Sequence, residues 1–411
     1  EVRFRGGSGF IRRNQLGPQR HLEIFFNDVD QGDSILIQTP EDQRILIDGG
    51  ETDDAHAFIT NKYRLDKADN YIDLEAVVAT HSDSDHTKGL LKILEDPKIA
   101  VKRVFHNGLF RWKSGGDPGL RAGRTVEGIV DDWPQESASR KLSSLMSDFV
   151  NAARKAQQNL PVALQAMSQQ ERWQGRLDFD PADFTFRRLE RKDVFMPPFD
   201  GIQSSFTLEV LWPWAQPDAN NMESYPWYGS AAKTVNGNSI VLKLTHGQNR
   251  ILLTGDLNEK SMDDLLELYD ERSGALSADV YKAAHHGSQH FSVPFLKAMA
   301  PDAAVVSSGD KAYDRHGHPR AVLMGTLTRY AKHPRPGVFC TELAQCYRKL
   351  SDTELRAFNQ GTRILYEKAI QGIVHLRSDG AQLYLGTVHG RPTPEDASRN
   401  INWKWDIWPD E

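Results

Sequence analysis

The sequence predicts a mixed α/β protein, and three observations support this fold class. Short apolar segments of strand character follow one another in two regions, residues 21–80 and residues 206–308, each bounded by Gly, Asp or Pro. Segments with apolar residues at helical spacing lie between them, as at residues 87–96. Charged and imidazole side chains follow the ends of several strands. This pattern is typical of helices packed on sheets with a site along one sheet edge.

The individual elements follow from the same periodicities. The first series of strands is expected at residues 21–26, 34–39, 44–50 and 74–80, followed by a helix at 87–96 and a strand at 101–106. The second series is expected at residues 206–212, 239–244, 250–256, 278–286 and 303–308, with a helix at 292–300 before its last strand. A closing hairpin is expected at residues 372–388.

Composition excludes several classes of protein. The 411 residues are 39% hydrophobic and 9% aromatic, enough for a sizeable core and unlike a disordered chain. Lysine and arginine number 50 against 56 acidic residues, and this net charge of −6 excludes a histone-like nucleic-acid binder. No stretch approaches the roughly 18 apolar residues of a membrane span, and the two cysteines, Cys340 and Cys346, fit a reducing compartment. We therefore expect a cytoplasmic protein without membrane contact.

The chain is expected to form one main domain with additions. Residues 21–390 form the main domain, and residues 108–200 read as a helical insertion with apolar residues at three- and four-residue steps. Residues 1–20 form a flexible basic arm, for which a loose terminus is favoured over a nucleic-acid arm. The Trp-rich tail at residues 391–411 is expected to pack on the core rather than dock a partner.

The strongest chemical signal is the segment THSDSDH at residues 80–86, where an apolar strand gives way to a helix expected to begin near Thr87. It carries four potential metal ligands on one short loop: His81, Asp83, Asp85 and His86. Imidazole and carboxylate groups suit zinc, manganese or iron. Without a cation, their mutual repulsion and desolvation would be costly. A structural role alone is therefore disfavoured.

Two later segments supply further ligands at strand ends. RILLTGD ends with Asp256, a carboxylate suited to bridging two ions, and DVYKAAHHGS ends with His285 and His286 before Gly287 and Ser288. Because strand ends gather at one edge of a sheet, these groups can meet the THSDSDH loop despite their distance along the chain.

The order of these motifs resembles the metallo-β-lactamase superfamily, and specifically the hydrolase domain of ComEC-like competence proteins. The motifs that carry the resemblance are NDVDQGDSILI at 27–37, ILIDGG at 45–50, THSDSDH, GNSIVLKL with LLTGD, HHGS, and HGHP at 316–319. Together they span roughly residues 21–320, apart from the insertion. The resemblance implies a four-layer αββα sandwich with two divalent ions, Zn²⁺ or Mn²⁺, as cofactors.

The resemblance also implies roles for individual residues. His81 and Asp83 would face one ion, Asp85 and His86 the second, with Asp256 bridging them and His285 or His286 completing the set. Asp48 would orient the ligand loop, and Asp33 and Ser34 would brace the same edge. Asp83 stands where most members have a second His, which makes manganese a competitor to zinc. The third motif of the family supplies a further histidine ligand, and His106 is the candidate for it in this sequence.

Two bound cations about 3.5 to 4 Å apart would activate a bridging water to hydroxide and stabilise the charge that develops on a phosphoryl or carbonyl oxygen. The expected function is therefore metal-dependent hydrolysis, of a phosphodiester in nucleic acid or a nucleotide-like substrate. Asp85 and His318 are the candidate catalytic residues, although His318 equally fits a hydrogen-bonded loop histidine. The Gly287 and Ser288 amides are candidates for holding a substrate oxygen.

The rival interpretations are a small-molecule hydrolase, of phosphorylcholine esterase or lactonase type, and a non-catalytic module stabilised by metal. A polar segment with Ser230, Lys233 and Asn238 could line the cleft but is more typical of a plain loop. A nuclease should show a positive groove, for which solvated surface charges are the favoured alternative. The candidate groove residues are Arg111, Lys113, Arg187, Arg188, Arg191 and Lys192.

Overall fold

The computed structural model describes residues 20–389, with short gaps, together with strands β1 (Val2–Phe4) and β2 (Gly7–Gly9). The gaps are residues 114–118, 171–172, 174–176, 203, 271–273, 310–316, 334–335, 346–350, 354–355, 357–359 and 361–366. The Trp-rich tail, Cys346 and most of the basic arm lie outside the described residues.

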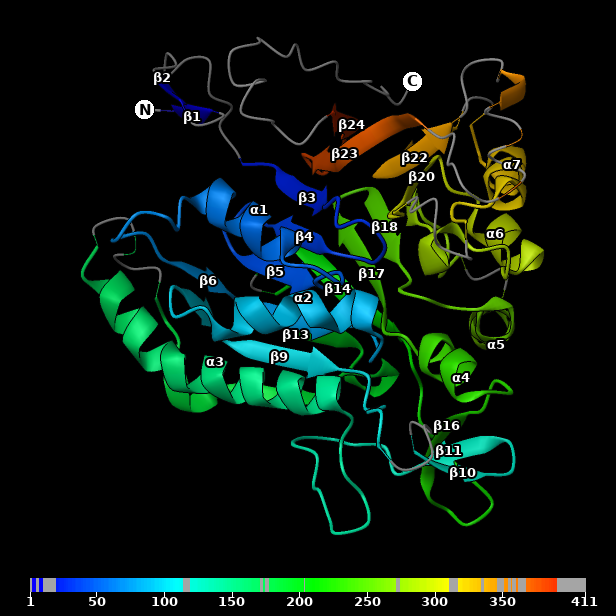
Figure 1. Ribbon diagram of the computed structural model, residues 1–411, viewed down its shortest axis with the longest axis horizontal. Helices are drawn as coiled ribbons and strands as arrows, with labels where there is room; N and C mark the ends of the chain where they lie inside the picture. Colours follow the sequence, from blue (N-terminus) through cyan, green and yellow to red (C-terminus); the bar gives the residue numbers. More distant parts are fainter. Residues whose placement is uncertain are drawn as a thin grey trace.

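Two large sheets form the centre of the described chain (Figure 1). The strands of the first sheet are, in spatial order, β12 (Thr185–Arg188), β9 (Arg103–His106), β7 (Ala76–Ala79), β5 (Arg44–Ile47), β4 (Ile35–Gln38), β3 (Leu22–Phe26), β23 (Glu367–Ser378) and β22 (Glu342–Gln345), and β24 (Leu383–His389) pairs with β23. The strands of the second sheet are β13 (Phe195–Asp200), β14 (Phe206–Trp212), β17 (Val241–His246), β18 (Asn249–Leu253), β19 (Val280–Lys282), β20 (Ala303–Val306) and β21 (Gly337–Cys340).

Helices cover the outer face of each sheet (Figure 1). The helices on the first sheet are α1 (Asp54–Tyr63), α2 (Ser84–Glu95) and α3 (Ser144–Ser168). The helices beside the second sheet are α4 (Ala231–Gly237), α5 (Glu259–Tyr269), α6 (Val293–Met299) and α7 (Ala321–Tyr330). Among the described residues, no helix has both the length and the apolar character needed to cross a membrane.

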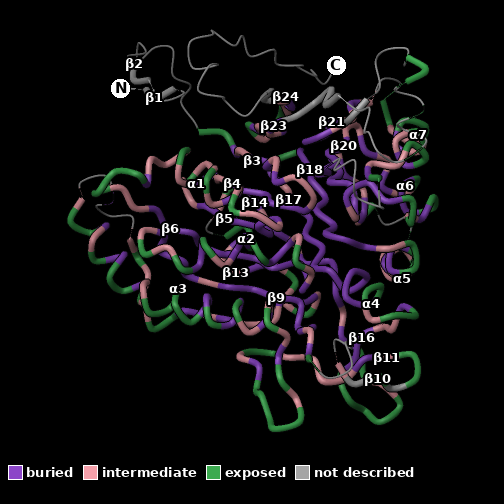
Figure 2. Tube along the Cα trace, in the orientation of Figure 1, coloured by how far each residue is buried: buried purple, intermediate pink, exposed green. Residues whose placement is uncertain are grey.

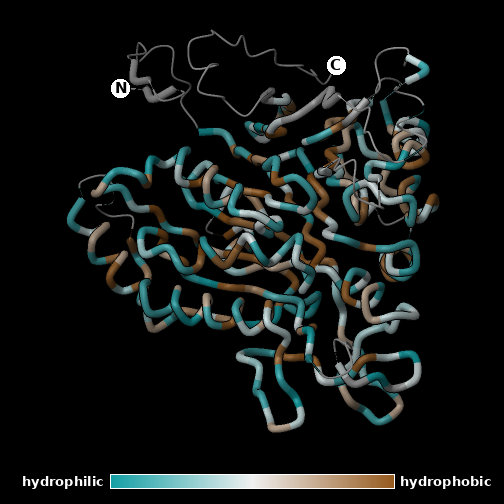
Figure 3. Tube along the Cα trace, in the orientation of Figure 1, coloured by the Kyte–Doolittle hydropathy of each residue, from teal (hydrophilic) through white to brown (hydrophobic). Residues whose placement is uncertain are grey.

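The core follows the two-residue period of the strands. In β5, Ile45 and Ile47 face the second sheet, whereas Leu46 packs against the outer helices. In the second sheet, Leu253 faces inward and Leu252 packs against α5 and its neighbours. Buried chain therefore runs through the middle of the molecule, and polar segments cover its outside (Figures 2 and 3). The predicted αββα sandwich is confirmed.

The segment at residues 108–200 is not a purely helical insertion. Its helix α3 packs on α2 and β8 (Ile99–Val101), as expected, but the same segment also supplies β12 and β13. These are the edge strands of the two large sheets. Its apolar residues therefore complete the sandwich, because edge strands extend the faces that the helices cover. A small sheet completes the region, in the order β10 (Leu120–Ala122), β11 (Thr125–Glu127), β16 (Glu223–Pro226) and β15 (Gln216–Pro217).

The sheet topology gathers several strand ends. β5 and β7 are parallel neighbours in the first sheet, and β18 and β19 are parallel neighbours in the second. Their carboxyl ends carry, in turn, Asp48, the THSDSDH segment, Asp256 and the HHGS segment. Contacts among these segments place all four at one edge of the sandwich.

Candidate metal centre

The THSDSDH segment turns directly from strand into helix. Helix α2 begins at Ser84, three residues earlier than expected, so Asp85 and His86 lie in its first turn. Asp83 occupies the N-cap position, but its side chain makes no capping hydrogen bond. The hydroxyl of Thr87 instead donates to the Asp83 carbonyl at 2.9 Å. The carboxylate of Asp83 is thereby left for other partners, and Asp85 gains from the helix dipole.

The carboxylate of Asp48 fixes the THSDSDH segment in place by hydrogen bonds. Asp48 is buried with a left-handed backbone, φ +57°, and its carboxylate accepts from the amide and hydroxyl of Thr80 at 2.8 and 2.7 Å. The same carboxylate lies 2.8 Å from Nδ1 of His86. Nδ1 therefore carries the proton, and the lone pair on Nε2 of His86 points into the site.

The QGDS turn, residues 31–34, packs closely against the start of α2. Gly32 has φ +125°, and a Cβ there would lie 2.1 Å from the Asp85 carbonyl oxygen. This close approach places Asp33 beside His286, with 3.5 Å between Asp33 Oδ1 and His286 Nδ1. The other carboxylate oxygen of Asp33 accepts from the fully buried ammonium of Lys282. Asp33 lies within the same 4.8 Å group as His86, but because Lys282 pairs with it, we assign it a positioning role.

His285 and His286 both adopt left-handed backbone conformations, with φ of 50° and 53°. His286 is buried, and its Nδ1 donates to the carbonyl of Ser307 at 3.1 Å. His285 faces the cleft, with 27% of its side chain exposed, and its Nε2 lies 3.8 Å from Asp256 Oδ2. Of the two histidines, His286 is therefore the one whose remaining nitrogen faces the ligand group.

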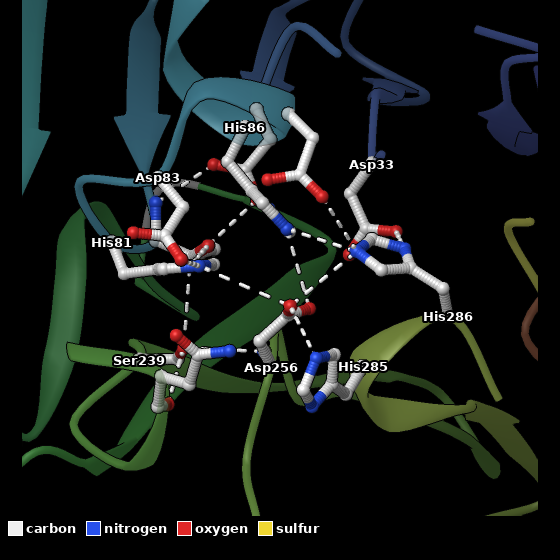
Figure 4. Close-up of polar contacts among 12 residues, drawn as sticks. Asp33, His81, Asp83, His86, Ser239, Asp256, His285 and His286 are labelled. Carbon is white, nitrogen blue, oxygen red and sulfur yellow. Dashed lines mark hydrogen bonds and ion pairs between the residues drawn. The ribbon is translucent and has the colours of Figure 1, made fainter. Parts of the chain in front are cut away.

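The first candidate ligand group consists of His86, Asp256 and His286, labelled in Figure 4, together with Asp85. The Nε2 atoms of His86 and His286 lie 3.3 Å apart, and each lies 3.3 to 3.4 Å from an oxygen of Asp256. Asp85 Oδ2 lies 3.3 Å from His286 Nε2. Ligand atoms about 2.1 Å from a tetrahedral ion lie about 3.4 Å apart. Two imidazole lone pairs aimed at each other fit one cation between them.

The second candidate ligand group consists of His81, Asp83 and Asp256 (Figure 4). His81 Nε2 is buried without a hydrogen-bond partner in the described chain, and it lies 3.8 Å from Asp83 Oδ2 and 4.0 Å from Asp256 Oδ2. These distances exceed a hydrogen bond and fit a shared cation. The hydroxyl of Ser239 lies 3.4 Å from Nδ1 of His81 and accepts from the amide of Asp256 at 3.1 Å. Asp256 belongs to both groups and is positioned to bridge them.

Arg111 holds the carboxylate of Asp83, a member of the second group, by hydrogen bonds. Its Nε donates to Asp83 Oδ1 at 3.0 Å, and its Nη2 donates to the same oxygen. Asp83 Oδ2 therefore remains the oxygen that faces His81. From the sequence, Arg111 was a candidate for a nucleic-acid groove, with a solvated surface charge as the favoured alternative; the structure makes it the partner of the candidate ligand Asp83.

The electrostatics of the site favour cation binding. Burial opposes protonation of His86 and His286, but the surrounding carboxylates, Asp256 first among them, outweigh it and hold the pKa of both well above the ordinary value. In the metal-free protein, protons therefore replace cations between these groups. The site has five carboxylates against the side-chain cations of Lys282 and Arg111, so three negative charges remain uncompensated while the histidines are neutral. Two divalent ions and one hydroxide would balance that charge.

A cleft of about 690 Å³ opens above these groups. His318 lines it, with its ring centroid 5.6 Å from that of His285. Ser230 and Lys233 also line it, but they belong to helix α4 and its cap rather than to a loop. Asn238 does not: it is buried, and its amide donates to backbone carbonyls.

Three candidate residues are placed away from their expected roles. The amide of Ser288 donates to the carbonyl of His285 at 2.8 Å, so it is not available to hold a substrate oxygen as expected. Gly287, also proposed for that role, is buried below Pro319. His106 is packed against the rings of Phe110 and Phe186 and has no described contact with either ligand group. Burial, with the charge of Arg188, lowers the pKa of His106 to about 3.

The basic residues of the 108–200 segment do not form an open positive groove. Arg187 pairs with Asp193, and Arg191 donates to the hydroxyl of Tyr269. Arg188 lies 2.7 to 3.2 Å from carboxylates of Asp131, Glu190 and Glu223, and Lys192 also pairs with Glu223. Lys113 is exposed on the surface. The charges that a nucleic-acid backbone would need are therefore largely neutralised by neighbours.

Comparisons with known proteins identify similar sequences. Residues 27–140 match the model of the metallo-beta-lactamase superfamily. ComE operon protein 3 of Bacillus subtilis is 29% identical over 97 residues, which cover 23% of this chain and 12% of that protein. Competence protein ComA of Neisseria gonorrhoeae is 41% identical over 75 residues, covering 18% and 10%. The chain thus spans about a tenth of the length of the curated relatives it matches.

Solved structures give more distant similarities. A metal-dependent hydrolase of the beta-lactamase superfamily has a TM-score of 0.35 at 14% identity, with 81% of this chain and 100% of that one covered. The diiron β-hydroxylase CmlA from Streptomyces venezuelae has a TM-score of 0.36 at 11% identity, with 79% and 53% covered.

The family match over residues 27–140 and the motifs at the strand ends indicate the class: the chain resembles the metallo-beta-lactamase superfamily and has a group of side chains able to bind metal. Within that superfamily it is similar to ComEC-like proteins, because the curated proteins it matches are competence proteins. The resemblance stated from the sequence motifs is confirmed.

Proposed function

We propose that the protein is a phosphodiesterase that uses two divalent ions, Zn²⁺ or Mn²⁺, and acts on a nucleic-acid or nucleotide-like substrate. The observation that carries the proposal is the meeting of the two ligand groups at Asp256, with imidazole and carboxylate atoms spaced for shared cations. When bound, the ions would supply an activated water and stabilise the charge of a phosphoryl oxygen. Carboxylate-rich ligand sets suit hard cations, which in turn suit anionic substrates.

The side chains around the ligand groups support this chemistry. The hydrogen bond from His286 and the charge of His86 outweigh burial and hold the pKa of Asp85 well below its ordinary value, so Asp85 stays ionised as a ligand. Burial lowers the pKa of His285, whose imidazole is neutral near pH 7 and can exchange a proton with the cleft. His318 lies next to it and could donate a hydrogen bond to a leaving oxygen.

The test combines metal analysis with a substrate panel. Protein stripped with a chelator and reloaded with Zn²⁺ or Mn²⁺ should hydrolyse bis-p-nitrophenyl phosphate, and Asp256→Asn should not. DNA, RNA, cyclic dinucleotides, a lactone and a phosphorylcholine ester complete the panel. Hydrolysis of only the lactone or the phosphorylcholine ester would favour the small-molecule rival. Metal binding without any turnover would favour the non-catalytic module.

A further inference from the structure

Two lysines on one wall of the cleft form no ion pair among the described residues, although the charge of Lys260 also acts on Asp264 of the same helix. Lys233, on α4, and Lys260, in the first turn of α5, both line the cleft above Asp256. In contrast, Arg187, Arg188 and Lys192 are all in ion pairs. Lys233 and Lys260 therefore place cations outside ion pairs directly in the cleft that holds the candidate metal ligands.

The backbone of this wall is fixed where the lysines emerge. The amide of Lys233 donates to the hydroxyl of Ser230 at 3.2 Å, and its carbonyl accepts from the side-chain amide of Asn258 at 2.8 Å. Asn258 also caps α5 by a reciprocal pair of hydrogen bonds with Ser261, at 3.0 and 3.3 Å. Lys260 follows directly within that capped turn. The two lysines are thus mounted on adjoining, mutually bonded helix starts.

The charges around the two lysines restrict what the wall can bind. Glu259 lies between Asn258 and Lys260 and lines the same cleft, and Glu51 lines it as well. Glu51 belongs to the segment after β5 rather than to this wall, so the wall of Lys233, Glu259 and Lys260 carries one net positive charge, which suits a single extra anionic group. A phosphate is the natural match because a lysine ammonium binds it as a point charge.

We propose that Lys233 and Lys260 form a second anion subsite, which selects phosphodiesters carrying an additional phosphate next to the scissile one. This inference rests on the proposed phosphodiesterase function and narrows its substrate class. Short phosphorylated oligonucleotides or dinucleotides have this chemistry, whereas an isolated diester does not. The scissile group would lie above Asp256, and the second phosphate would contact the lysine wall.

The test uses two substrates that differ only in the second phosphate: adenylyl-adenosine with and without a 5′-phosphate. The native enzyme should hydrolyse the phosphorylated substrate with a kcat/KM about tenfold higher, which corresponds to about 1.4 kcal/mol. In the variant Lys233→Met/Lys260→Met this ratio should fall below about twofold. The variant Lys233→Arg/Lys260→Arg should restore it, since the charge is kept.

Lys88 is an exposed lysine of α2 outside the cleft, so the variant Lys88→Met is the matched control. It should leave the kcat/KM ratio of the two substrates unchanged. Raised salt should reduce the ratio in the native enzyme, because the contact is electrostatic. If the native enzyme shows no preference, or the double methionine variant keeps it, the subsite is refuted while phosphodiester hydrolysis stands. If no diester is hydrolysed at all, the proposed function itself fails.

Discussion

Replacing Lys282 by Met should destabilise the metal-free protein strongly. The side chains of Lys282 and Asp33 are 0% and 1% exposed, so the change leaves a buried carboxylate without its counter-ion. Removing one partner of a buried ion pair costs about 3 to 5 kcal/mol. In the metal-free protein, protonated His86 and His286 offset part of the negative charge of the site, and the substitution raises the uncompensated charge by one. We therefore expect the free energy of unfolding, measured with urea in a chelator, to fall by about 4 kcal/mol.

Two comparisons separate this cause from simple loss of packing. The variant Lys282→Met/Asp33→Asn removes both charges and should recover most of the lost stability, because an amide costs less to bury than a carboxylate. Added Mn²⁺ or Zn²⁺ should stabilise the single variant more than it stabilises the native protein. A loss below about 1 kcal/mol in the single variant, or a double variant no more stable than the single one, would refute the reasoning.

Three further results are expected. Removal of metal by a chelator should abolish activity and lower the thermal unfolding temperature together, and active protein with well under one metal per chain would contradict this. Asp256→Ala should reduce turnover by several orders of magnitude while circular dichroism stays native, whereas Lys88→Ala should have little effect; equal losses would indicate misfolding. Because the pKa values of His86 and His286 are raised, cations must displace their protons, so metal affinity should increase with pH; calorimetry in buffers of different ionisation enthalpy would show the released protons, and their absence would exclude this exchange.

Much of the site could be predicted from sequence because its ligands follow buried strands. The four candidate ligands of THSDSDH come directly after β7, and Asp256 comes shortly after β18. Short apolar runs bounded by Gly, Asp or Pro identified these strands, and parallel pairing brings their ends together. The apolar pattern of the strands therefore predicts both the strands and the sheet edge at which the candidate site lies.

The missed residues depend on contacts that no local pattern shows. Arg111 reaches Asp83 because β9 pairs with β7, which sets residues that are 28 positions apart side by side. Lys282 faces Asp33 across 249 positions, although a lysine inside an apolar strand was a visible signal. The edge strands β12 and β13 were read as part of a helical segment, because their sequences, TFRR and FMPPFD, lack clean alternation.

The left-handed backbone at Asp48, His285 and His286 limits how this site can change over evolution. Outside glycine, that conformation is adopted mainly by Asn, Asp and His, so both chemistry and backbone restrict these positions. A relative that has lost catalysis could keep its fold with Asn or Gly there, while a β-branched residue would strain the turn. Asn at these three positions would therefore be the sequence signature of a relative that has lost catalysis but still folds.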